Sequence, residues 1–389
     1  MQIDAKLKNK VLEEMQALID ANRQGLLSAN AADIKAFSSD DKALYDRLKI
    51  DSSKIDGVIA SLRQVQRQED PIGITLYEHT HPNGMQVYNK TAPFGSVLII
   101  YESRPDVTIE AASIAFKSSN KIKLKGGKEA INSNLFLVDM WHKALSKHGV
   151  SEEWIEYLSL SRDETQAYLK NPPHKLDLIV PRGGEKLIRF VKAHAHCPVL
   201  ISGRGNNFIY IDESADIDMA REVVLNAKTS KISACNALDK VLMHQSHVES
   251  GYYDSMLKSL KGKGVEVLAA RSRPSEYPSS LWEEEFLDMK ILISPVKGLE
   301  EAITQINMHS GGHSASIITR EVAHANLFMS QVDAAAVYHN ASTRFTDGGQ
   351  FGMGAELAIS TDKLHHRGPL GINELVTNKW HIHGTGQIR

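Results

Sequence analysis

The sequence has few cysteines and no long hydrophobic run. These two features argue against a disulfide-rich protein and against a membrane or secreted one. Its 389 residues include 2 Cys, Cys197 and Cys235, which form no Cys-x-x-Cys pair. This argues against a disulfide framework and for a reducing compartment, so we expect the cytoplasm. The longest aliphatic runs span four or five residues, as at 97–100. Because such runs are too short for a membrane span or a signal-peptide core, we expect a soluble protein.

An excess of charge of one sign is also lacking. The chain carries 45 Lys and Arg against 47 Asp and Glu, a formal net charge of -2. This balance gives no broad attraction to nucleic acids or anionic membranes, so neither is expected as a partner and anion binding must be local. The 17 His form no His-Glu-x-x-His pattern, and no paired cysteines accompany them. We therefore expect no metal site.

The chain does contain a regular order of helical and strand-like segments. Residues 1–70 are rich in charge and carry an apolar stripe typical of an amphipathic helix, at Leu7, Val11, Met15 and Leu18. A hairpin follows, in which Asn83-Gly84 is expected to supply the positive-φ residues of a tight turn.

From Pro93 onward, short β-rich runs alternate with longer helical patterns. This alternation predicts βαβ crossovers and parallel, doubly wound sheets. A second cycle starts after about residue 230, and the chain is long enough for two α/β domains. The expected strands are 97–101, 121–124, 176–180 and 208–211 in the first cycle, and 241–244, 265–269, 291–294, 315–319 and 335–339 in the second.

Two glycine turns are candidates for binding a nucleotide. Arg182-Gly183-Gly184 ends an apolar strand and opens a helix, so its backbone N–H groups and the cation suit a pyrophosphate, although it also fits a plain β-α turn. Lys125 precedes another Gly-Gly pair at the carboxyl end of a strand. It is placed to meet a ribose phosphate, and the alternative is a strand with one solvated basic face.

Cys235 is the candidate nucleophile. It follows a segment with two lysines and precedes a run that we interpret as helical, so a helix N-terminus and a positive field are expected to favour its thiolate. The alternative is an inert packing residue, which is the interpretation for Cys197.

A glycine-rich polar stretch at 340–356 is the candidate substrate loop. Arg344, Asp347 and Glu356 lie within it and are able to hold an α-carboxylate and an α-ammonium group. A mobile surface loop is the alternative interpretation.

Together these motifs resemble those of one family. From about Tyr101 to Arg389 the chain is similar to γ-glutamyl phosphate reductase, also called glutamate-5-semialdehyde dehydrogenase, a branch of the aldehyde dehydrogenase superfamily. The similar segments, in order, are Tyr101-Glu-Ser-Arg-Pro-Asp-Val-Thr, Leu124-Lys-Gly-Gly-Lys-Glu, Pro181-Arg-Gly-Gly, Tyr210-Ile-Asp-Glu-Ser-Ala-Asp, Asn226-Ala-Lys-Thr, Ser233-Ala-Cys-Asn-Ala, Ala341-Ser-Thr-Arg-Phe-Thr-Asp-Gly-Gly-Gln-Phe-Gly-Met-Gly-Ala-Glu and Lys363-Leu-His-His-Arg-Gly-Pro-Leu-Gly.

The resemblance implies an aldehyde dehydrogenase-like α/β fold with two doubly wound domains and a small β oligomerisation element. The implied parts are a cofactor-binding domain at 1–72 and 93–227, a catalytic domain at 228–374, and an oligomerisation element at 73–92 and 375–389. The implied partners are further copies of the chain and, as an option, the upstream glutamate kinase.

The resemblance also implies site residues. Cys235 matches the catalytic cysteine, Asn236 follows it, Lys125 stands at the adenosine-ribose position, and Glu285 matches the carboxylate that holds the nicotinamide ribose. Residues in the substrate pocket of related enzymes correspond to Asn340, Ser342, Thr343, Arg344 and Phe351. The chain departs from the family pattern at Lys231, at Ile232 and in the loop 202–207.

The implied reaction is the NADPH-dependent reduction of L-glutamyl 5-phosphate to L-glutamate 5-semialdehyde and phosphate, in proline biosynthesis. A thioester on Cys235 would carry the acyl group, with the N–H of Cys235 and a side chain such as Arg104 or Asn236 as oxyanion donors. Two alternatives are a hydrolytic aldehyde dehydrogenase and a non-catalytic scaffold. Since 200–205 lacks the Glu that activates water in hydrolytic relatives, phosphate is favoured as the acyl acceptor.

Overall fold

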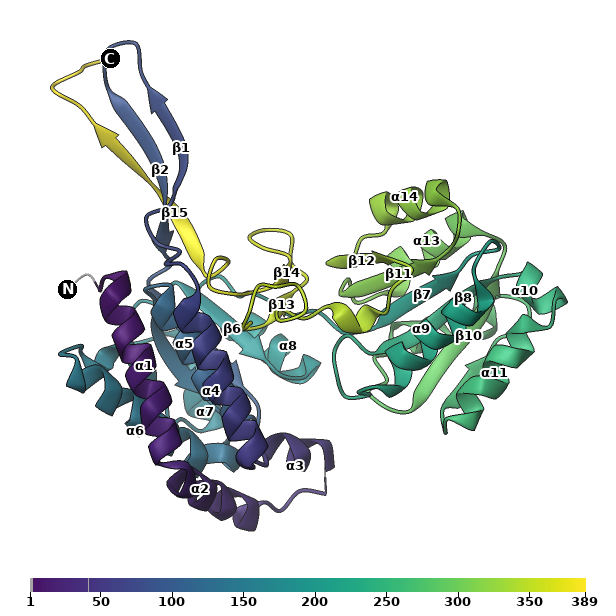
Figure 1. Cartoon of the computed structure of the whole chain (residues 1–389), viewed down its shortest axis with the longest axis horizontal. Coiled ribbons are helices and arrows are strands. Elements are labelled where there is room, and N and C mark those ends of the chain that lie inside the picture. The colour runs from purple at the N-terminus through teal and green to yellow at the C-terminus, as the bar shows by residue number, and fades with distance from the viewer. Residues whose placement is uncertain (1–2, 41) are drawn as a thin grey trace. The chain divides into compact units, whose positions relative to one another are not determined.

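The computed structural model describes residues 3–40 and 42–389. They form two compact units. Unit 1 comprises Met1–Ile201, Gly352–Ala358 and Leu370–Arg389, and unit 2 comprises Ser202–Phe351 and Ile359–Pro369. Figure 1 shows that each unit contains its own sheet flanked by helices.

Unit 1 is built around a four-stranded sheet of order β5-β4-β3-β6 in which all neighbours are parallel. Its strands are β3 (Ser96–Tyr101), β4 (Lys121–Lys125), β5 (Ile155–Tyr157) and β6 (Leu178–Arg182). Its helices are α1 (Ala5–Ala21), α2 (Arg23–Ala36), α3 (Lys42–Leu48), α4 (Ser52–Arg67), α5 (Pro105–Lys117), α6 (Ile131–Lys147), α7 (Arg162–Lys170) and α8 (Glu185–His194), with 3-10 turns η1 (Lys128–Ala130) and η2 (Glu152–Trp154).

Unit 2 is built around a six-stranded parallel sheet of order β12-β11-β7-β8-β10-β9. Its strands are β7 (Asn207–Ile211), β8 (Leu238–His244), β9 (Glu266–Ala269), β10 (Lys290–Val296), β11 (Ser314–Ile318) and β12 (Ala336–His339), with a small pair β13 (Ile359–Ser360) and β14 (Gly368–Pro369). Its helices are α9 (Ile217–Thr229), α10 (Ser246–Glu249), α11 (Tyr252–Gly262), α12 (Ser279–Glu283), α13 (Leu299–His309) and α14 (Val322–Gln331), with 3-10 turns η3 (Pro274–Glu276) and η4 (Thr343–Phe345).

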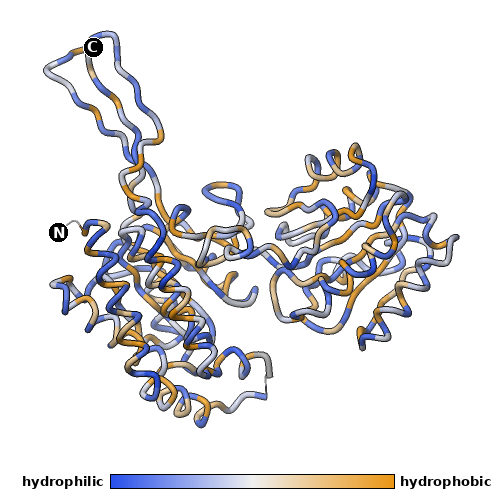
Figure 2. Tube along the Cα trace, viewed as in Figure 1, coloured by the Kyte–Doolittle hydropathy of each residue, from blue (hydrophilic) through white to orange (hydrophobic). Residues whose placement is uncertain are grey.

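The central strands are apolar without alternation because both of their faces are buried. In β3, Val97 and Ile99 contribute to one hydrophobic core, while Leu98 and Ile100 contribute to another. Figure 2 shows these strands as mainly orange segments enclosed by helices of mixed colour. The predicted parallel α/β architecture is therefore confirmed in both units.

The strand at 208–211 belongs to a different sheet from the one predicted. Its position along the chain predicts that it belongs to the first cycle, but β7 pairs with β8 and β11 in the sheet of unit 2. The order of elements along a chain does not specify which sheet a strand joins, because that choice depends on contacts between distant residues.

The amphipathic helix predicted near the N-terminus is α1. The Asp4 side chain caps it by accepting a hydrogen bond from the N–H of Leu7. Val11 and Met15 of the predicted stripe are fully buried, and Leu7 and Leu18 pack against the same core. The helix is thus held by the apolar face that its spacing predicted.

A three-stranded antiparallel sheet, which we call the arm, is formed by β1 (Thr75–Thr80), β2 (Gln86–Pro93) and β15 (Val376–His383). The predicted hairpin and its tight turn are confirmed, since the N–H of Gly84 donates to the carbonyl of His81 at 2.8 Å and the N–H of His81 donates to the carbonyl of Met85 at 2.8 Å. Gly84 has a φ of 86°, and Asn83 is not among the described residues with positive φ. Asn83 instead accepts a hydrogen bond from the N–H of Met85 through its side chain.

Two features are absent from residues 3–40 and 42–389. Within these ranges no helix has the length and apolar character required to cross a membrane. The same residues contain no group of three or more His, Cys, Asp or Glu side chains arranged to hold a metal ion.

Candidate active site

Cys235 lies in a turn between α9 and β8, and it is half-buried. The predicted helix after it is wrong, because the residues from Leu238 onward form a central strand. A strand buried on both faces shows the same dense apolar pattern as a buried helix. Cys235 therefore lies at the amino-terminal ends of the strands of the unit 2 sheet. The described residues that directly follow it form no helix, so no helix N-terminus of that kind acts on its thiol.

Two residues of the preceding loop hold the backbone of Cys235 in place. A Cβ atom on Gly205 would overlap the carbonyl group of Cys235, so only glycine allows this approach. Asn207 donates from Nδ2 to the carbonyl oxygen of Cys235 at 2.8 Å and to that of Ala237 at 2.7 Å. Neither residue had a role predicted from the sequence, although both lie in the loop 202–207 that departs from the family pattern.

The Arg344 guanidinium lies close enough to Cys235 for the two side chains to interact electrostatically. Burial lowers the pKa of Arg344, while the nearby groups Cys235 and Asp347 act in the opposite direction. Arg344 Nε donates to Ser230 Oγ at 3.1 Å, and its Nη1 is buried with no hydrogen-bond partner among the described residues. A guanidinium attracts a nearby anion, so this arrangement suits a thiolate intermediate at Cys235, and the buried Nη1 remains as a donor for a ligand.

Asn236 is buried directly after the cysteine. Its Nδ2 donates to the carbonyl oxygens of Arg344 at 3.2 Å and Thr346 at 2.9 Å. Both hydrogens of the amide are thereby used, so this side chain holds the Arg344 segment and does not offer a donor to an oxyanion. Thr343 completes the connection by donating from Oγ1 to the carbonyl oxygen of Asn236 at 2.8 Å.

The two cysteines are expected to react at different rates with iodoacetamide. Burial is the main factor that raises the pKa of the Cys197 thiol, with Asp177 acting in the same direction, whereas Cys235 lies near a guanidinium. Since the thiolate is the reactive form, Cys235 should be alkylated at least about tenfold faster at neutral pH. Peptide mapping over time measures both rates, and earlier labelling of Cys197 would contradict the assignment of the nucleophile.

Glu285 lies near the same loop. A Cβ on Gly205 would stand 2.6 Å from Glu285 Oε1, so Gly205 separates this carboxylate from the carbonyl of Cys235. The structure therefore brings Cys235, Arg344 and Glu285 to one edge of the unit 2 sheet.

Only some residues of the predicted substrate loop lie near Cys235. Ser342 is buried and caps η4 by accepting from the N–H of Arg344. Asn340, with φ of 55°, binds both backbone groups of Thr319 just beyond the carboxyl end of β11. Because Cys235 precedes β8 in the same parallel sheet, Asn340 lies at the opposite edge, and we do not retain it in the substrate site. Phe351 is exposed and donates its N–H to the carbonyl of Asp347.

Lys125 ends β4 in unit 1, as expected for a ligand-binding position. It is half-buried, and its Nζ donates to the carbonyl oxygen of Gly126 at 2.8 Å. Burial lowers the pKa of Lys125, whereas Glu129 acts in the opposite direction.

The Arg182-Gly183-Gly184 turn joins β6 to α8 in unit 1. The N–H of Gly184, which caps α8, donates to Glu102 Oε1 at 3.0 Å, and a Cβ on Gly183 would overlap the Glu102 side chain. The helix N-terminus thus binds an anionic group of the chain itself. Arg182 donates to the carbonyl of Leu357, so its side chain is directed toward the backbone of unit 1.

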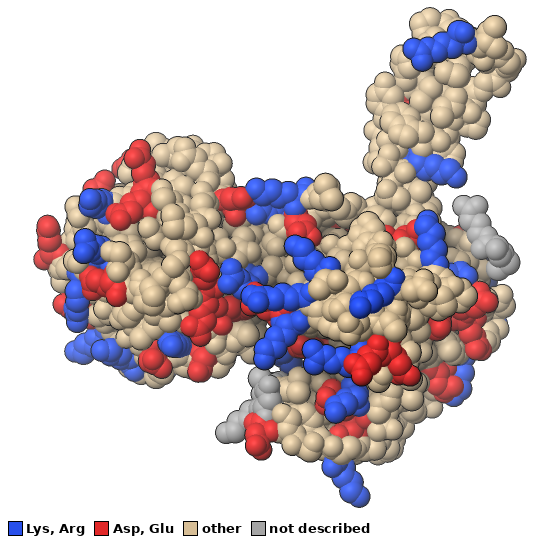
Figure 3. Space-filling view, turned by 180° about the vertical axis from the view of Figure 1, so that it is seen from behind, with Lys and Arg blue, Asp and Glu red and all other residues tan. Residues whose placement is uncertain are grey.

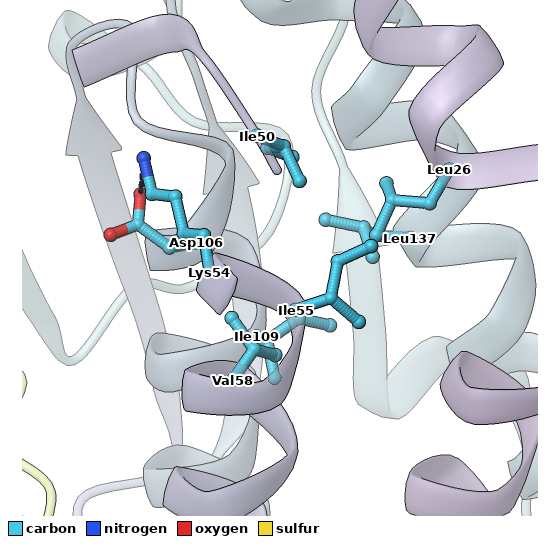
Figure 4. A pocket seen from close by; sticks show the side chains of 8 residues that line it. All are labelled: Leu26, Ile50, Lys54, Ile55, Val58, Asp106, Ile109 and Leu137. Carbon is cyan, nitrogen blue, oxygen red and sulfur yellow. Dashed lines mark ion pairs between the residues drawn. The ribbon is translucent and has the colours of Figure 1, made fainter. Parts of the chain in front are cut away.

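Arg104 caps α5 in unit 1 within a charged cluster. Its Nη2 lies 3.3 Å from Asp106 Oδ2, and Lys54 Nζ lies 3.7 Å from Asp106 Oδ1. Figure 4 shows Lys54 and Asp106 directed toward each other at the border of a pocket. The remaining lining residues are aliphatic, namely Leu26, Ile50, Ile55, Val58, Ile109 and Leu137. The role of Arg104 toward an oxyanion stays a prediction.

The chain is similar to known proteins over its whole length. The model of the aldehyde dehydrogenase family matches residues 278–356. A gamma-glutamyl phosphate reductase of Koribacter versatilis is 42% identical over 396 residues, which cover 100% of this chain and 96% of that protein. The crystal structure of the gamma-glutamyl phosphate reductase of Thermotoga maritima matches with a TM-score of 0.93 and 37% identity, covering 100% of this chain and 95% of that one.

A more distant structure shares the fold alone. An acetylating aldehyde dehydrogenase of Geobacillus thermoglucosidasius has a TM-score of 0.70 at 16% identity, covering 100% of this chain and 94% of that one. The identity and coverage of the nearer relatives confirm the resemblance carried by the motifs. The chain belongs to the γ-glutamyl phosphate reductase family, a family of oxidoreductases with the aldehyde dehydrogenase fold.

Proposed function

We propose that the chain reduces L-glutamyl 5-phosphate to L-glutamate 5-semialdehyde and phosphate with NADPH, through a thioester on Cys235, as a step of proline biosynthesis. The names of its relatives support the substrate. The observation that carries the chemistry is the half-buried Cys235 beside the Arg344 guanidinium. This is the environment expected of a nucleophilic thiolate.

In the proposed reaction, the Sγ of Cys235 attacks the acyl carbon of the substrate. The bond from that carbon to the phosphate oxygen then breaks, phosphate leaves with the electron pair, and a thioester remains. The thioester carbon would then accept a hydride, which is the chemistry that a bound reduced nicotinamide would supply. The resulting thiohemiacetal collapses to the aldehyde and restores the Cys235 thiolate. The backbone N–H of Cys235 is the proposed oxyanion donor, since the side chain of Asn236 is already engaged.

Arg344 is proposed to bind the α-carboxylate of the substrate. Its Nε is held by Ser230, while its Nη1 is buried without a partner among residues 3–40 and 42–389. A buried donor of this kind is costly unless a ligand satisfies it, and a guanidinium suits a carboxylate. Ser342 and Thr343 position the segment that carries it.

The residues of unit 1 fit the phosphate groups of a dinucleotide. The N–H of Gly184 already binds the carboxylate of Glu102, so the N-terminus of α8 accepts an anion, and a phosphate there would replace Glu102 or use the neighbouring N–H groups. Lys125 is proposed to meet the 2′-phosphate, and Glu285 of unit 2 the nicotinamide ribose. The cofactor, when bound, supplies the hydride.

Replacing Lys125 by Ala should raise the KM for NADPH about tenfold or more, with a smaller effect on the KM for NADH. The reason is that only NADPH carries the 2′-phosphate, and a charged hydrogen bond contributes about 1.5–3 kcal/mol. Steady-state kinetics with both cofactors measure the ratio. Lys121→Ala, on the same strand but exposed and paired with Glu153, is the matched control. Equal losses for the two cofactors would show that Lys125 does not contact the 2′-phosphate.

The arm is proposed to pair with another copy of the chain. It exposes large apolar side chains, at Leu76, Tyr77, Trp380 and Ile382. In Figure 3 the arm is mostly tan, with few charged residues. Since a small isolated sheet is marginally stable in water, such a surface favours association. The cofactor-binding, catalytic and oligomerisation roles of the parts, and contact with glutamate kinase, stay predictions.

Deleting residues 76–89 should lower the oligomeric state and leave the two parallel sheets intact, because in the described part of the chain β1, β2 and β15 form a sheet separate from them. Light scattering gives the mass, and circular dichroism reports the fold. An unchanged mass would show that the arm makes no contact between subunits.

A further inference from the structure

A buried cluster of charges lies directly after the catalytic turn. Lys228 at the end of α9 and Asp239 on β8 form an ion pair with Nζ to Oδ1 at 3.2 Å, and their side chains are 0% and 3% exposed. Lys240 follows on the same strand and is also fully buried. Burying three charged groups is costly, and neither the fold nor the proposed reaction yet gives them a role.

Both residues of β8 bind the backbone on either side of Glu285. Lys240 Nζ donates to the carbonyl oxygen of Glu284 at 2.7 Å, and the N–H of Phe286 donates to Asp239 Oδ2 at 3.2 Å. Successive side chains of a strand leave on opposite faces, so the segment is held from two sides. The ammonium of Lys240 also lies 3.7 Å from the centroid of the Phe286 ring.

The loop before β7 anchors the two residues ahead of this segment. Arg204 Nη1 donates to the carbonyl oxygen of Glu283 at 3.0 Å, and Asn206 Nδ2 donates to that of Trp282 at 2.6 Å. This is the same loop whose Gly205 touches the carbonyl of Cys235. The segment 282–286 is therefore hydrogen-bonded both to β8, which follows Cys235, and to the loop whose Gly205 contacts the backbone of Cys235.

We propose that Asp239 and Lys240 form a positioning clamp, which fixes the peptide groups flanking Glu285 so that its carboxylate meets the nicotinamide ribose beside Cys235. Lys228 supports the clamp by neutralising Asp239. The inference rests on the proposed function, because it takes the cofactor contact of Glu285 from there. Asp239 and Lys240 are positioning residues that act through Glu285.

Burial supports this assignment. Desolvation lowers the pKa of Lys240 to about 7, with Asp239 and Glu284 acting to raise it and Lys228 and Lys290 acting to lower it further. Lys240 in turn helps to lower the pKa of His309, chiefly a result of burial. Burying a lysine in this way costs folding free energy. A role in holding Glu284 and Phe286 would explain why the lysine is present.

Two charge-balanced double variants separate positioning from stability. Lys228→Met with Asp239→Leu removes the ion pair and the acceptor for the N–H of Phe286. Lys228→Met with Asp239→Asn removes the same charges but keeps an amide oxygen as acceptor, and is the matched control. Exchanging a buried ion pair for uncharged residues is often neutral for stability, so both proteins should fold. Lys240→Met, which removes the anchor of Glu284, is an independent third variant.

NADPH binding is measured by fluorescence titration of the full chain in the Cys235→Ala background, so no turnover is involved. The Leu variant and Lys240→Met should each weaken binding about tenfold, and the Asn control should lie within about threefold of the parent. Thermal melts followed by circular dichroism verify the fold of each protein.

Combining Glu285→Gln with the Leu variant tests whether Asp239 acts on NADPH binding through Glu285 or only by stabilising the hydrophobic core. If Asp239 acts through Glu285, the Leu variant should cause little further loss in the Glu285→Gln background, whereas independent effects would multiply. The clamp would be overturned if the Leu variant, the Asn control and the parent bound NADPH equally well. It would also be overturned if the losses caused by the Leu variant and by Glu285→Gln multiplied when the two were combined. Failure of the parent to bind NADPH, or normal binding by Glu285→Gln alone, would instead overturn the cofactor contact in the proposed function.

Discussion

Replacing Cys235 by Ala is expected to abolish the reduction of glutamyl phosphate, with a loss of more than about a thousandfold in kcat. The sulfur carries the covalent intermediate, and no neighbouring group replaces it. The fold should persist, because the contact that fixes this position is made by the backbone carbonyl of Cys235 with Asn207, which an alanine retains. Activity is measured by NADPH oxidation with the acyl phosphate, and NADPH binding by fluorescence.

Cys197→Ala is the matched control, since Cys197 lies half-buried in unit 1. It should keep nearly full activity. Survival of more than a few per cent of the activity in Cys235→Ala, with unchanged NADPH binding, would remove the thioester from the mechanism. It would then favour direct hydride transfer to the acyl phosphate.

Omitting phosphate should stop the reverse reaction after one turnover. With semialdehyde and NADP⁺, the chain should form the Cys235 thioester and release at most one NADPH per subunit. Phosphate is already anionic and needs no general base, whereas water needs a carboxylate to take its proton. Residues 200–205 contain no such carboxylate. Steady NADPH production should therefore depend on added phosphate, and it is followed by absorbance.

Glu285 provides the stringent control for this experiment, because its carboxylate lies near Gly205 and the catalytic turn. If Glu285 activated water, sustained turnover would occur without phosphate and Glu285→Gln would suppress it. That pair of results would replace the acyl-phosphate reductase with a hydrolytic aldehyde dehydrogenase. We expect Glu285→Gln to change NADP⁺ affinity and to leave the phosphate requirement intact.

The parallel sheets were predictable because their strands are short apolar runs separated by helical patterns. The strand after Cys235 was predicted only in its second half, at 241–244, and its first residues, which lie next to the site, were interpreted as helical. Asp239 and Lys240 interrupt its apolar run, and their burial becomes understandable only with Lys228, Glu284 and Phe286 in place. A local sequence pattern shows which residues are charged. It does not show which distant groups will pair with those charges or form hydrogen bonds with them.

The candidate site, too, was predictable from the sequence only in part. Motifs identified Cys235, Arg344 and Glu285, and the structure brings these three to one edge of a sheet. Asn236 and Asn340 have the right chemistry for substrate contacts, yet the Nδ2 of Asn236 and both polar atoms of the Asn340 amide form hydrogen bonds with the backbone. Amides satisfy buried backbone groups as readily as they bind ligands, and sequence does not separate these uses.

The central claim, an acyl group carried by Cys235 and transferred only to phosphate, is tested most directly by the mass of the stalled protein. The chain is incubated with semialdehyde and NADP⁺ in phosphate-free buffer, and intact and peptide masses are recorded before and after phosphate is added. We predict one glutamyl group per subunit, located on the peptide that contains Cys235, and its loss once phosphate is supplied. An unmodified Cys235 during a measured burst of NADPH, or loss of the acyl group in buffer alone, would contradict the account.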